Sequence, residues 1–232
     1  MAARRWRGLV IAWKAFSYTL GALVIAFVLA QLWFYGHIVY WSRYPPESTA
    51  FMERSSARLK HQWVPYERIS VHLKRAVVAA EDARFLDHEG FDWDMIQKAI
   101  VRNEKRGRVV AGASTISQQL AKNLFLSGER SWLRKGQEAI ITWMLEDVLS
   151  KRRILELYLN LAEWGDGVFG AEAAARQHFG VSAAATSSAE SIASISDSRT
   201  ASETSTRISP SRAALTRFQT SSRSSSGSAS RR

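Results

Sequence analysis

The stretch VHLKRAVVAAED, residues 71–82, decides how the middle of this chain folds. Its apolar residues recur at the spacing of one face of an α-helix. Two acidic residues, Glu81 and Asp82, follow the apolar run at 77–80. A carboxylate that emerges from such a surface can have its pKa raised by desolvation, which suits a general base. An acid merely exposed at a helix end is an equally good interpretation of this pair alone.

Helical patterns continue towards the C-terminus. Residues 92–100 begin with the candidate N-cap Asp92, and residues 114–124 begin with the candidate N-cap Ser114. Three further helices are expected over residues 132–149, 152–161 and 171–178. Alternating patterns typical of strands are scarce, so we expect a mainly α-helical soluble domain over residues 43–180.

An uncharged segment, residues 15–42, precedes this domain and follows a basic N-terminus. A helix of about 20 residues crosses the hydrocarbon core of a membrane, and this segment is long enough. We expect one transmembrane anchor, with residues 1–14 in the cytoplasm because basic flanks stay on that side. A cleaved signal peptide is the alternative, with a weak cleavage site near Ala30. The anchor is expected to supply location rather than chemistry.

Composition narrows the chemistry. The 232 residues include no cysteine, which excludes disulfides, thiolate metal sites and a cysteine nucleophile. The formal net charge of +11 favours anionic partners such as lipids or phosphorylated substrates. The basic run over residues 102–108 could suggest nucleic acid, but the anchor places the domain outside the cytoplasm. We therefore expect no nucleic-acid partner. The run is interpreted either as a solvated, mobile loop or, as we favour, as a mobile flap near the lipid headgroups.

The composition changes at about residue 181, where Ser, Thr, Ala and Arg replace the helical patterns. Such a segment cannot bury enough apolar surface to order itself, so residues 181–232 are expected to form a disordered tail. The tail is either a genuine Ser-rich extension or the product of a reading-frame change, and the resemblance described below favours the frame change.

Charged residues gather at the start of the segment 132–149. Arg130, Arg134 and Glu138 are spaced four apart and would share one face of a helix that reached Arg130, and Lys135 is adjacent. Such a face could bind a diphosphate or form a surface ion-pair ladder, and the ladder is favoured on this evidence alone. Asp92 and Asp94 resemble a metal-binding pair, but helix capping explains them better.

Five motifs stand in order after the anchor. They are EDARFLDHEG at 81–90, GASTISQQLAKN at 112–123, RKGQE at 134–138, KRRILELYLN at 151–160 and GVFGAEAAARQHFG at 167–180. Together they resemble the monofunctional biosynthetic peptidoglycan transglycosylases, which share a module with bifunctional penicillin-binding proteins. The resemblance covers residues 4–180.

The resemblance implies a lysozyme-like, mainly α-helical glycosyltransferase domain at the outer face of the inner membrane. Its substrates would be lipid II and a growing glycan on undecaprenyl diphosphate, joined by a β-1,4 bond with inversion. Other wall-synthesis or division proteins are the expected protein partners. The family continues after its fifth motif with apolar helices, and the Ser-rich segment departs from that pattern.

The resemblance also implies residue roles. Glu81 would be the catalytic base, and Glu138 a second catalytic glutamate that positions cations or assists departure of the diphosphate. The expected substrate-binding residues are Ser114, Thr115, Gln118, Gln119, Lys122, Asn123, Arg130, Arg134 and Lys135. No dedicated metal site is visible, although Mg²⁺ or Mn²⁺ could screen the diphosphate. Glu156, Tyr158 and Asn160 are expected to support the fold.

Two other functions fit parts of the sequence. A lytic enzyme of the same broad fold would need an acid opposite a sugar leaving group, and the cations of the second and third motifs disfavour it. A non-catalytic anchored scaffold of the wall-synthesis machinery is disfavoured by the presence of both Glu81 and Glu138.

Overall fold

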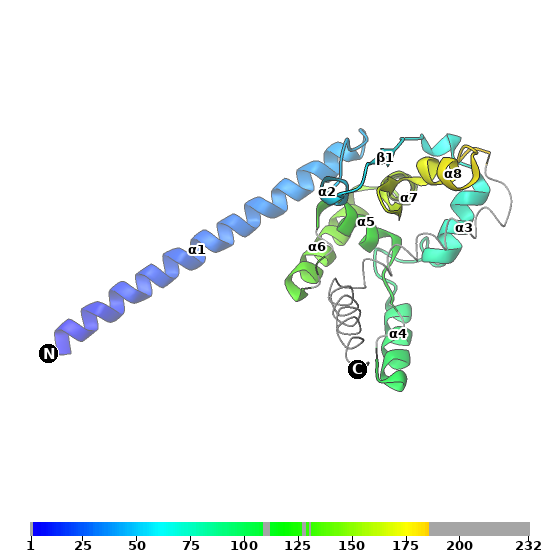
Figure 1. The fold of residues 1–232 in the computed structure, drawn as a ribbon. Coiled ribbons are helices and arrows are strands. Elements are labelled where there is room, and N and C mark those ends of the chain that lie inside the picture. Colours follow the sequence, from blue (N-terminus) through cyan, green and yellow to red (C-terminus); the bar gives the residue numbers. More distant parts are fainter. Residues whose placement is uncertain (1, 109–111, 127–128, 130, 186–232) are drawn as a thin grey trace, which may run out of the picture. The chain divides into compact units, whose positions relative to one another are not determined.

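The computed structural model describes residues 2–108, 112–126, 129 and 131–185. The chain forms two compact units, each described here by itself. The first unit comprises Met1–Glu53 and Arg84–Tyr158, and the second comprises Arg54–Ala83 and Leu159–Arg232. Helices dominate both units (Figure 1), which confirms the predicted mainly α-helical class.

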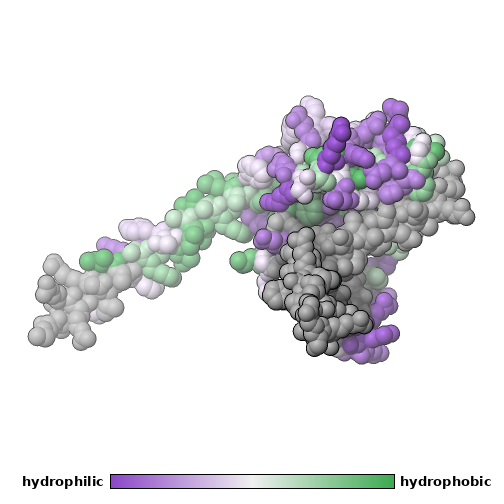
Figure 2. All heavy atoms as spheres, in the orientation of Figure 1, coloured by the Kyte–Doolittle hydropathy of each residue, from purple (hydrophilic) through white to green (hydrophobic). Residues whose placement is uncertain are grey.

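Helix α1, Ala2–Trp41, is a single long helix in the first unit. Its part Trp13–Trp41 is long and apolar enough to cross a membrane, in agreement with the expected span at residues 15–42. The described side chains along this part form a largely apolar, exposed surface (Figure 2). Exposed apolar residues on a long helix are what a lipid environment accommodates.

The C-terminal third of α1 also packs on the protein. The side-chain amides of Gln31 and Gln137 donate to each other at 3.2 and 2.9 Å. One turn further on, the Tyr35 hydroxyl donates to the Asp147 carboxylate at 3.4 Å. The Phe125 ring lies 5.0 Å from that of Trp41, centroid to centroid. Helix α1 is thus part of the packing of the first unit, and the expectation that the anchor supplies location rather than chemistry stays a prediction.

Helices α5, Ile116–Phe125, and α6, Trp132–Val148, pack against each other in the first unit (Figure 1). Helix α5 begins with a reciprocal capping box, in which Thr115 and Gln118 each accept from the other's backbone N–H. The N-cap of α5 is therefore Thr115, not the expected Ser114. A capping box satisfies two backbone donors that the helix start leaves unpaired.

Helix α4, Trp93–Arg106, begins at the predicted N-cap, because the Asp92 carboxylate accepts from the backbone N–H of Met95 at 2.9 Å. The helix continues through the basic run and ends at Gly107, which has φ +61°. The expectation of a loop over 102–108 was therefore wrong for residues 102–106, which are helical. These residues include no apolar side chain, but Arg, Glu and Lys are good helix formers, and the helix stops only where Gly107 adopts the left-handed conformation.

Helix α7, Lys151–Leu161, carries all three residues expected to support the fold. The buried Tyr158 hydroxyl donates to the Gln119 side chain at 3.2 Å, which joins α7 to α5 in the first unit. Arg153 pairs with Glu156 at 2.7 Å and donates to the backbone carbonyl of Trp41 at 2.9 Å. The expectation that Glu156 and Tyr158 serve the fold is consistent with these contacts.

The second unit contains α3, Val71–Glu81, a short 3-10 helix, Tyr66–Arg68, and a three-stranded sheet. The sheet consists of β1 (Lys60–His61), β2 (Glu163–Gly165) and β3 (Val168–Phe169) in the order β1-β3-β2. The short helix α2, Ala50–Arg54, precedes the sheet in the chain. The side chain of Asn160 joins α7's last turn to Val64, accepting at 2.8 Å and donating at 2.9 Å.

Helix α8, Ala171–Phe179, packs its buried alanines against this sheet. The chain then continues in place beyond the expected domain end at residue 180. The buried Glu172 carboxylate accepts from the Ser182 hydroxyl at 2.9 Å and the Ala183 backbone N–H at 2.7 Å. Residues 181–185 therefore belong to the packed unit, and the rest of the expected tail lies outside the described residues.

Candidate functional site

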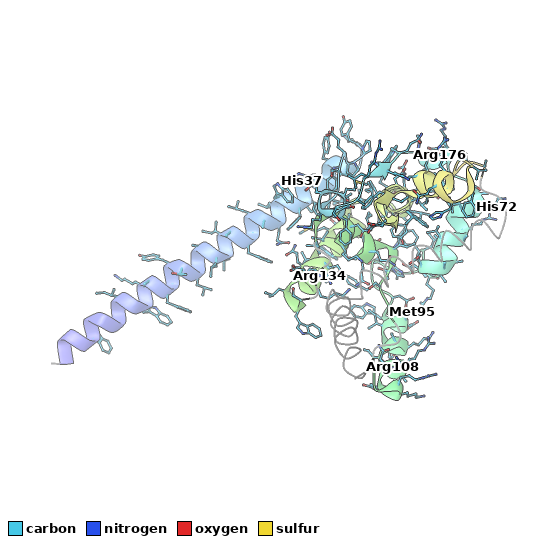
Figure 3. The ribbon with its side chains drawn as sticks, viewed as in Figure 1. His37, His72, Met95, Arg108, Arg134 and Arg176 are labelled. Carbon is cyan, nitrogen blue, oxygen red and sulfur yellow. The ribbon has the colours of Figure 1, made fainter. Side chains whose placement is uncertain are left out.

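A buried carboxylate with two cations lies near the start of α6. Glu138 is only 3% exposed, and its Oε2 accepts from Arg134 Nη1 at 2.6 Å. Its Oε1 pairs with the ammonium of Lys135. Figure 3 shows Arg134 near the N-terminal end of α6. Charges that share one helix face at spacings of three and four residues can pair in this way.

The cluster retains positive charge and an unused donor. Two cations and one carboxylate leave a net charge of +1 at the start of α6. Arg134 is 17% exposed, and its buried Nε has no hydrogen-bond partner among the residues that the structure describes. A buried N–H that lacks a partner is costly, and an anionic ligand would satisfy both the donor and the charge.

Arg130 does not belong to this described cluster. The Ser131 hydroxyl accepts from the backbone N–H of Arg134 at 3.1 Å, so Ser131 is the N-cap and α6 begins at Trp132. The expected helical face from Arg130 to Glu138 therefore begins only at Arg134. Arg130 itself lies outside the described residues.

The polar residues of the second motif lie on and before α5. Gln118, Gln119 and Asn123 are buried, whereas Ser114 is exposed. The Gln119 amide donates to the Ser114 carbonyl at 3.3 Å. Lys122 is half-buried, with its ammonium 5.6 Å from the Phe51 ring centroid. Much of this polar set is thus held within the first unit by its own hydrogen bonds, which fixes the positions that a ligand would meet.

Glu81 belongs to the second unit. It is the last residue of α3, and its side chain is half-buried. Asp82 follows as the C-cap, with a buried side chain, and its backbone N–H donates to the Val78 carbonyl at 2.9 Å. The predicted helix end at Glu81 and Asp82 is therefore confirmed, and the role of Glu81 as a base stays a prediction.

Comparison with known proteins decides the family. A family model described as transglycosylase matches residues 48–223, which is most of the chain and includes part of the segment expected to be a tail. The chain belongs to the transglycosylase family.

Relatives named biosynthetic peptidoglycan transglycosylase support the same assignment. The one from Methylobacillus flagellatus is 57% identical over 187 residues, covering 77% of each chain. Those from Azoarcus sp. and Thiobacillus denitrificans are 55% and 58% identical, covering 77% and 74% of this chain and 81% and 78% of their own. The family resemblance carried by the five motifs is thus confirmed, and with it a glycosyltransferase role in peptidoglycan synthesis.

The transglycosylase motifs also contain residues that the sequence did not single out. In the first motif, Arg84 pairs with Asp92 at 3.3 Å and with Asp94. The hydrogen bond to Asp94 and the nearby charges of both carboxylates raise the pKa of Arg84 above its usual value. Both aspartates thus hold this loop, but only Asp92 also caps α4; Asp94 lies in the first turn of the helix, so its interpretation as a cap was wrong. The interpretation of Asp92 as a cap is confirmed. Nothing in the sequence indicated that the two aspartates also pair with Arg84.

Proposed function

We propose that this transglycosylase polymerises lipid II into β-1,4-linked glycan strands. The observation that carries the proposal is the buried Glu138 between Arg134 and Lys135, with an unpaired guanidinium N–H and a net positive charge. A diphosphate is already a good leaving group, so it needs neutralisation of its charge more than protonation. This cluster supplies that neutralisation and could donate hydrogen bonds to phosphate oxygens.

The chemical step requires a base as well as cations. In the proposed reaction, the 4-hydroxyl oxygen of the acceptor N-acetylglucosamine forms a bond to the donor's anomeric carbon. The bond from that carbon to the diphosphate oxygen breaks, and the acceptor proton passes to the carboxylate of Glu81. Undecaprenyl diphosphate leaves with the bonding electron pair. Attack opposite to the leaving group inverts the anomeric centre.

Substrate binding is assigned to the polar residues of α5 and the cations of α6. The exposed Ser114, the half-buried Lys122 and the buried amides are proposed to contact sugar or phosphate. Within the described ranges, no three His, Asp or Glu side chains come together as a metal site. A divalent cation would therefore take the substrate's own oxygens as its main ligands, and no step is assigned to it.

The location follows from the anchor. We propose a single-pass protein of the inner membrane, with a cytoplasmic N-terminus and the catalytic domain on the outer face. The apolar helix Trp13–Trp41 and the basic residues before it support this orientation. Both donor and acceptor are membrane lipids, so an anchored enzyme meets them by diffusion in two dimensions.

Incubation with two substrates tests the proposal. The full-length protein in detergent is given purified lipid II in one arm and finished peptidoglycan in the other. We expect glycan polymer from lipid II and no soluble fragments from peptidoglycan. Release of fragments without polymer would indicate a lytic enzyme, and inactivity in both arms would indicate a scaffold.

A further inference from the structure

A second buried carboxylate on α6 takes no part in the cluster around Glu138. Glu146 is 7% exposed and lies eight residues further along the helix. Its Oε1 accepts from the Ser117 hydroxyl at 2.5 Å and from the Lys151 ammonium at 2.9 Å. Hydrogen bonds to an ionised carboxylate are stronger than those between neutral groups, and burial limits their exchange with water.

The ammonium of Lys151 also contacts the segment 84–90, which belongs to the first unit. It donates to the backbone carbonyl of His88 at 2.5 Å and lies 4.7 Å from the ring centroid of the buried Phe85. Lys151 is the first residue of α7 and is 25% exposed. One side chain thus joins α7, α6 and the segment 84–90.

The end of that segment is fitted tightly against α6. Gly90 has φ +88°, and a Cβ there would lie 2.8 Å from Thr142 Cγ2 and 3.1 Å from Glu146 Cγ. The Gly90 carbonyl accepts from the hydroxyl of Thr115 at 2.7 Å. Thr115 is the N-cap of α5, so the same segment reaches the helix start that also carries Ser117.

We propose that Glu146 and Lys151 are positioning residues for the glycosyltransferase reaction. Through Ser117 and the segment 84–90, the pair sets the placement of the first turn of α5. That turn carries Gln118 and Gln119, which belong to the proposed substrate-binding set, so this inference rests on the proposed function. A desolvated ion pair suits this task because it tolerates few alternative geometries, and losing one partner leaves an uncompensated buried charge.

The first test replaces single members of the pair. Glu146→Gln keeps the shape but removes the charge that holds both donors, and we expect kcat/KM to fall about 10²-fold, the loss typical of a displacement near 1 Å. Ser117→Ala removes only the link to α5 and should cost about tenfold. Lys151→Arg keeps the charge and should retain more activity than Lys151→Met.

A matched control lies on α7, the helix that begins with Lys151. Glu156→Gln breaks the ion pair with Arg153, which has a similar N–O distance of 2.7 Å and is also largely buried. It should lower the thermal midpoint while leaving kcat/KM per folded molecule unchanged. Folding of each variant is followed by circular dichroism, and rates are compared well below the lowest midpoint.

A double-mutant cycle separates positioning from stability. If Glu146 acts through Ser117, the double variant should lose no more kcat/KM than Glu146→Gln alone. Independent, multiplying losses would overturn the inference, as would wild-type kcat/KM in folded Glu146→Gln. If Glu146→Gln does not fold, Ser117→Ala decides, and a wild-type rate in that variant overturns the inference. Failure of the wild type itself to polymerise lipid II would instead reject the proposed function.

Discussion

The two glutamates assigned to the reaction stand in different settings. Glu138 is 3% exposed and paired with two cations inside the first unit, whereas Glu81 ends a helix of the second unit and is half-buried. Both carboxylate oxygens of Glu138 already accept hydrogen bonds, one from Arg134 and one from Lys135, so this side chain is placed to organise the cations. A partly exposed carboxylate at a helix end can exchange a proton with a substrate hydroxyl. The difference agrees with the roles proposed above, charge organisation for Glu138 and proton transfer for Glu81.

The largest expected effect is that of Glu81→Gln. The amide keeps the shape but cannot accept the acceptor's proton, and losing a general base lowers the rate by about 10²–10⁴-fold. Lipid II binding should stay largely intact, which equilibrium binding and single-turnover polymerisation measure together. Wild-type turnover in this variant would reject Glu81 as the base.

Glu138→Gln should have a smaller effect of a different kind. Removing the carboxylate releases Arg134 and Lys135 from their partner and raises the local net charge from +1 to +2. We expect kcat to fall about 10²-fold through misplacement of the cations, while KM stays the same or falls. Rates measured over a range of lipid II concentrations separate the two constants. A raised KM with unchanged kcat would mean that Glu138 contributes binding only.

Shortening α1 tests how far the setting of Glu138 depends on the anchor. Removing residues 1–42 deletes Gln31, whose amide pairs with Gln137 beside Glu138. Removing residues 1–12 keeps that contact and the span. We expect several-fold lower polymerisation in detergent for the longer deletion only, because each lost buried hydrogen bond is worth about 1 kcal/mol. Equal activity of both proteins in detergent would support the view that the anchor supplies location only.

The smallest expected effect concerns the second unit and pH. Burial lowers the pKa of His61 below its usual value near 6.5, and its hydrogen bond to the Asn160 carbonyl opposes this shift in part. Unfolded His61 therefore takes up a proton at higher pH than folded His61, so the free energy of unfolding should decrease as pH falls from about 7 to 5.

His61 lies at the surface and its ring is only partly desolvated, so this decrease should stay well below the ~1.4 kcal/mol that one full pKa unit represents. Urea unfolding at the two pH values, for wild type and His61→Gln, measures it. The variant should show the shallower dependence on pH. An identical dependence in both proteins would remove His61 as the source.

The sequence predicted those parts of the fold that local patterns determine. The end of α3 follows from apolar spacing and the start of α4 from capping by Asp92, and both were confirmed, whereas α4 runs further than its apolar pattern predicted. The start of α5 was predicted one residue early, because Ser114 and Thr115 are equally good caps by composition and only the reciprocal bond with Gln118 distinguishes them. Local patterns thus give element types reliably and their ends less well.

Contacts between residues far apart in the chain could not be predicted from such local sequence patterns. Glu146 stands outside every motif, and its partners Ser117 and Lys151 come from different helices. Likewise, residues 181–183 begin the Ser-rich segment, yet the Glu172 carboxylate holds them in place by two hydrogen bonds. Composition reports the average ability of a segment to order itself, whereas one buried acceptor elsewhere in the chain can fix a few residues.

The unbroken course of α1 has a mechanical consequence. Residues 15–30 rise about 24 Å along the helix, and residues 31–41, which contact the protein, rise about 16 Å more. Because the helix is continuous, residues 15–30 and residues 31–41 move as one rigid element. In the membrane location proposed above, the position of residues 15–30 in the lipid would therefore set the height of α6 above the membrane centre. A thicker or thinner bilayer would raise or lower the cations of α6 relative to the phosphate headgroups, so polymerisation rate should depend on acyl-chain length.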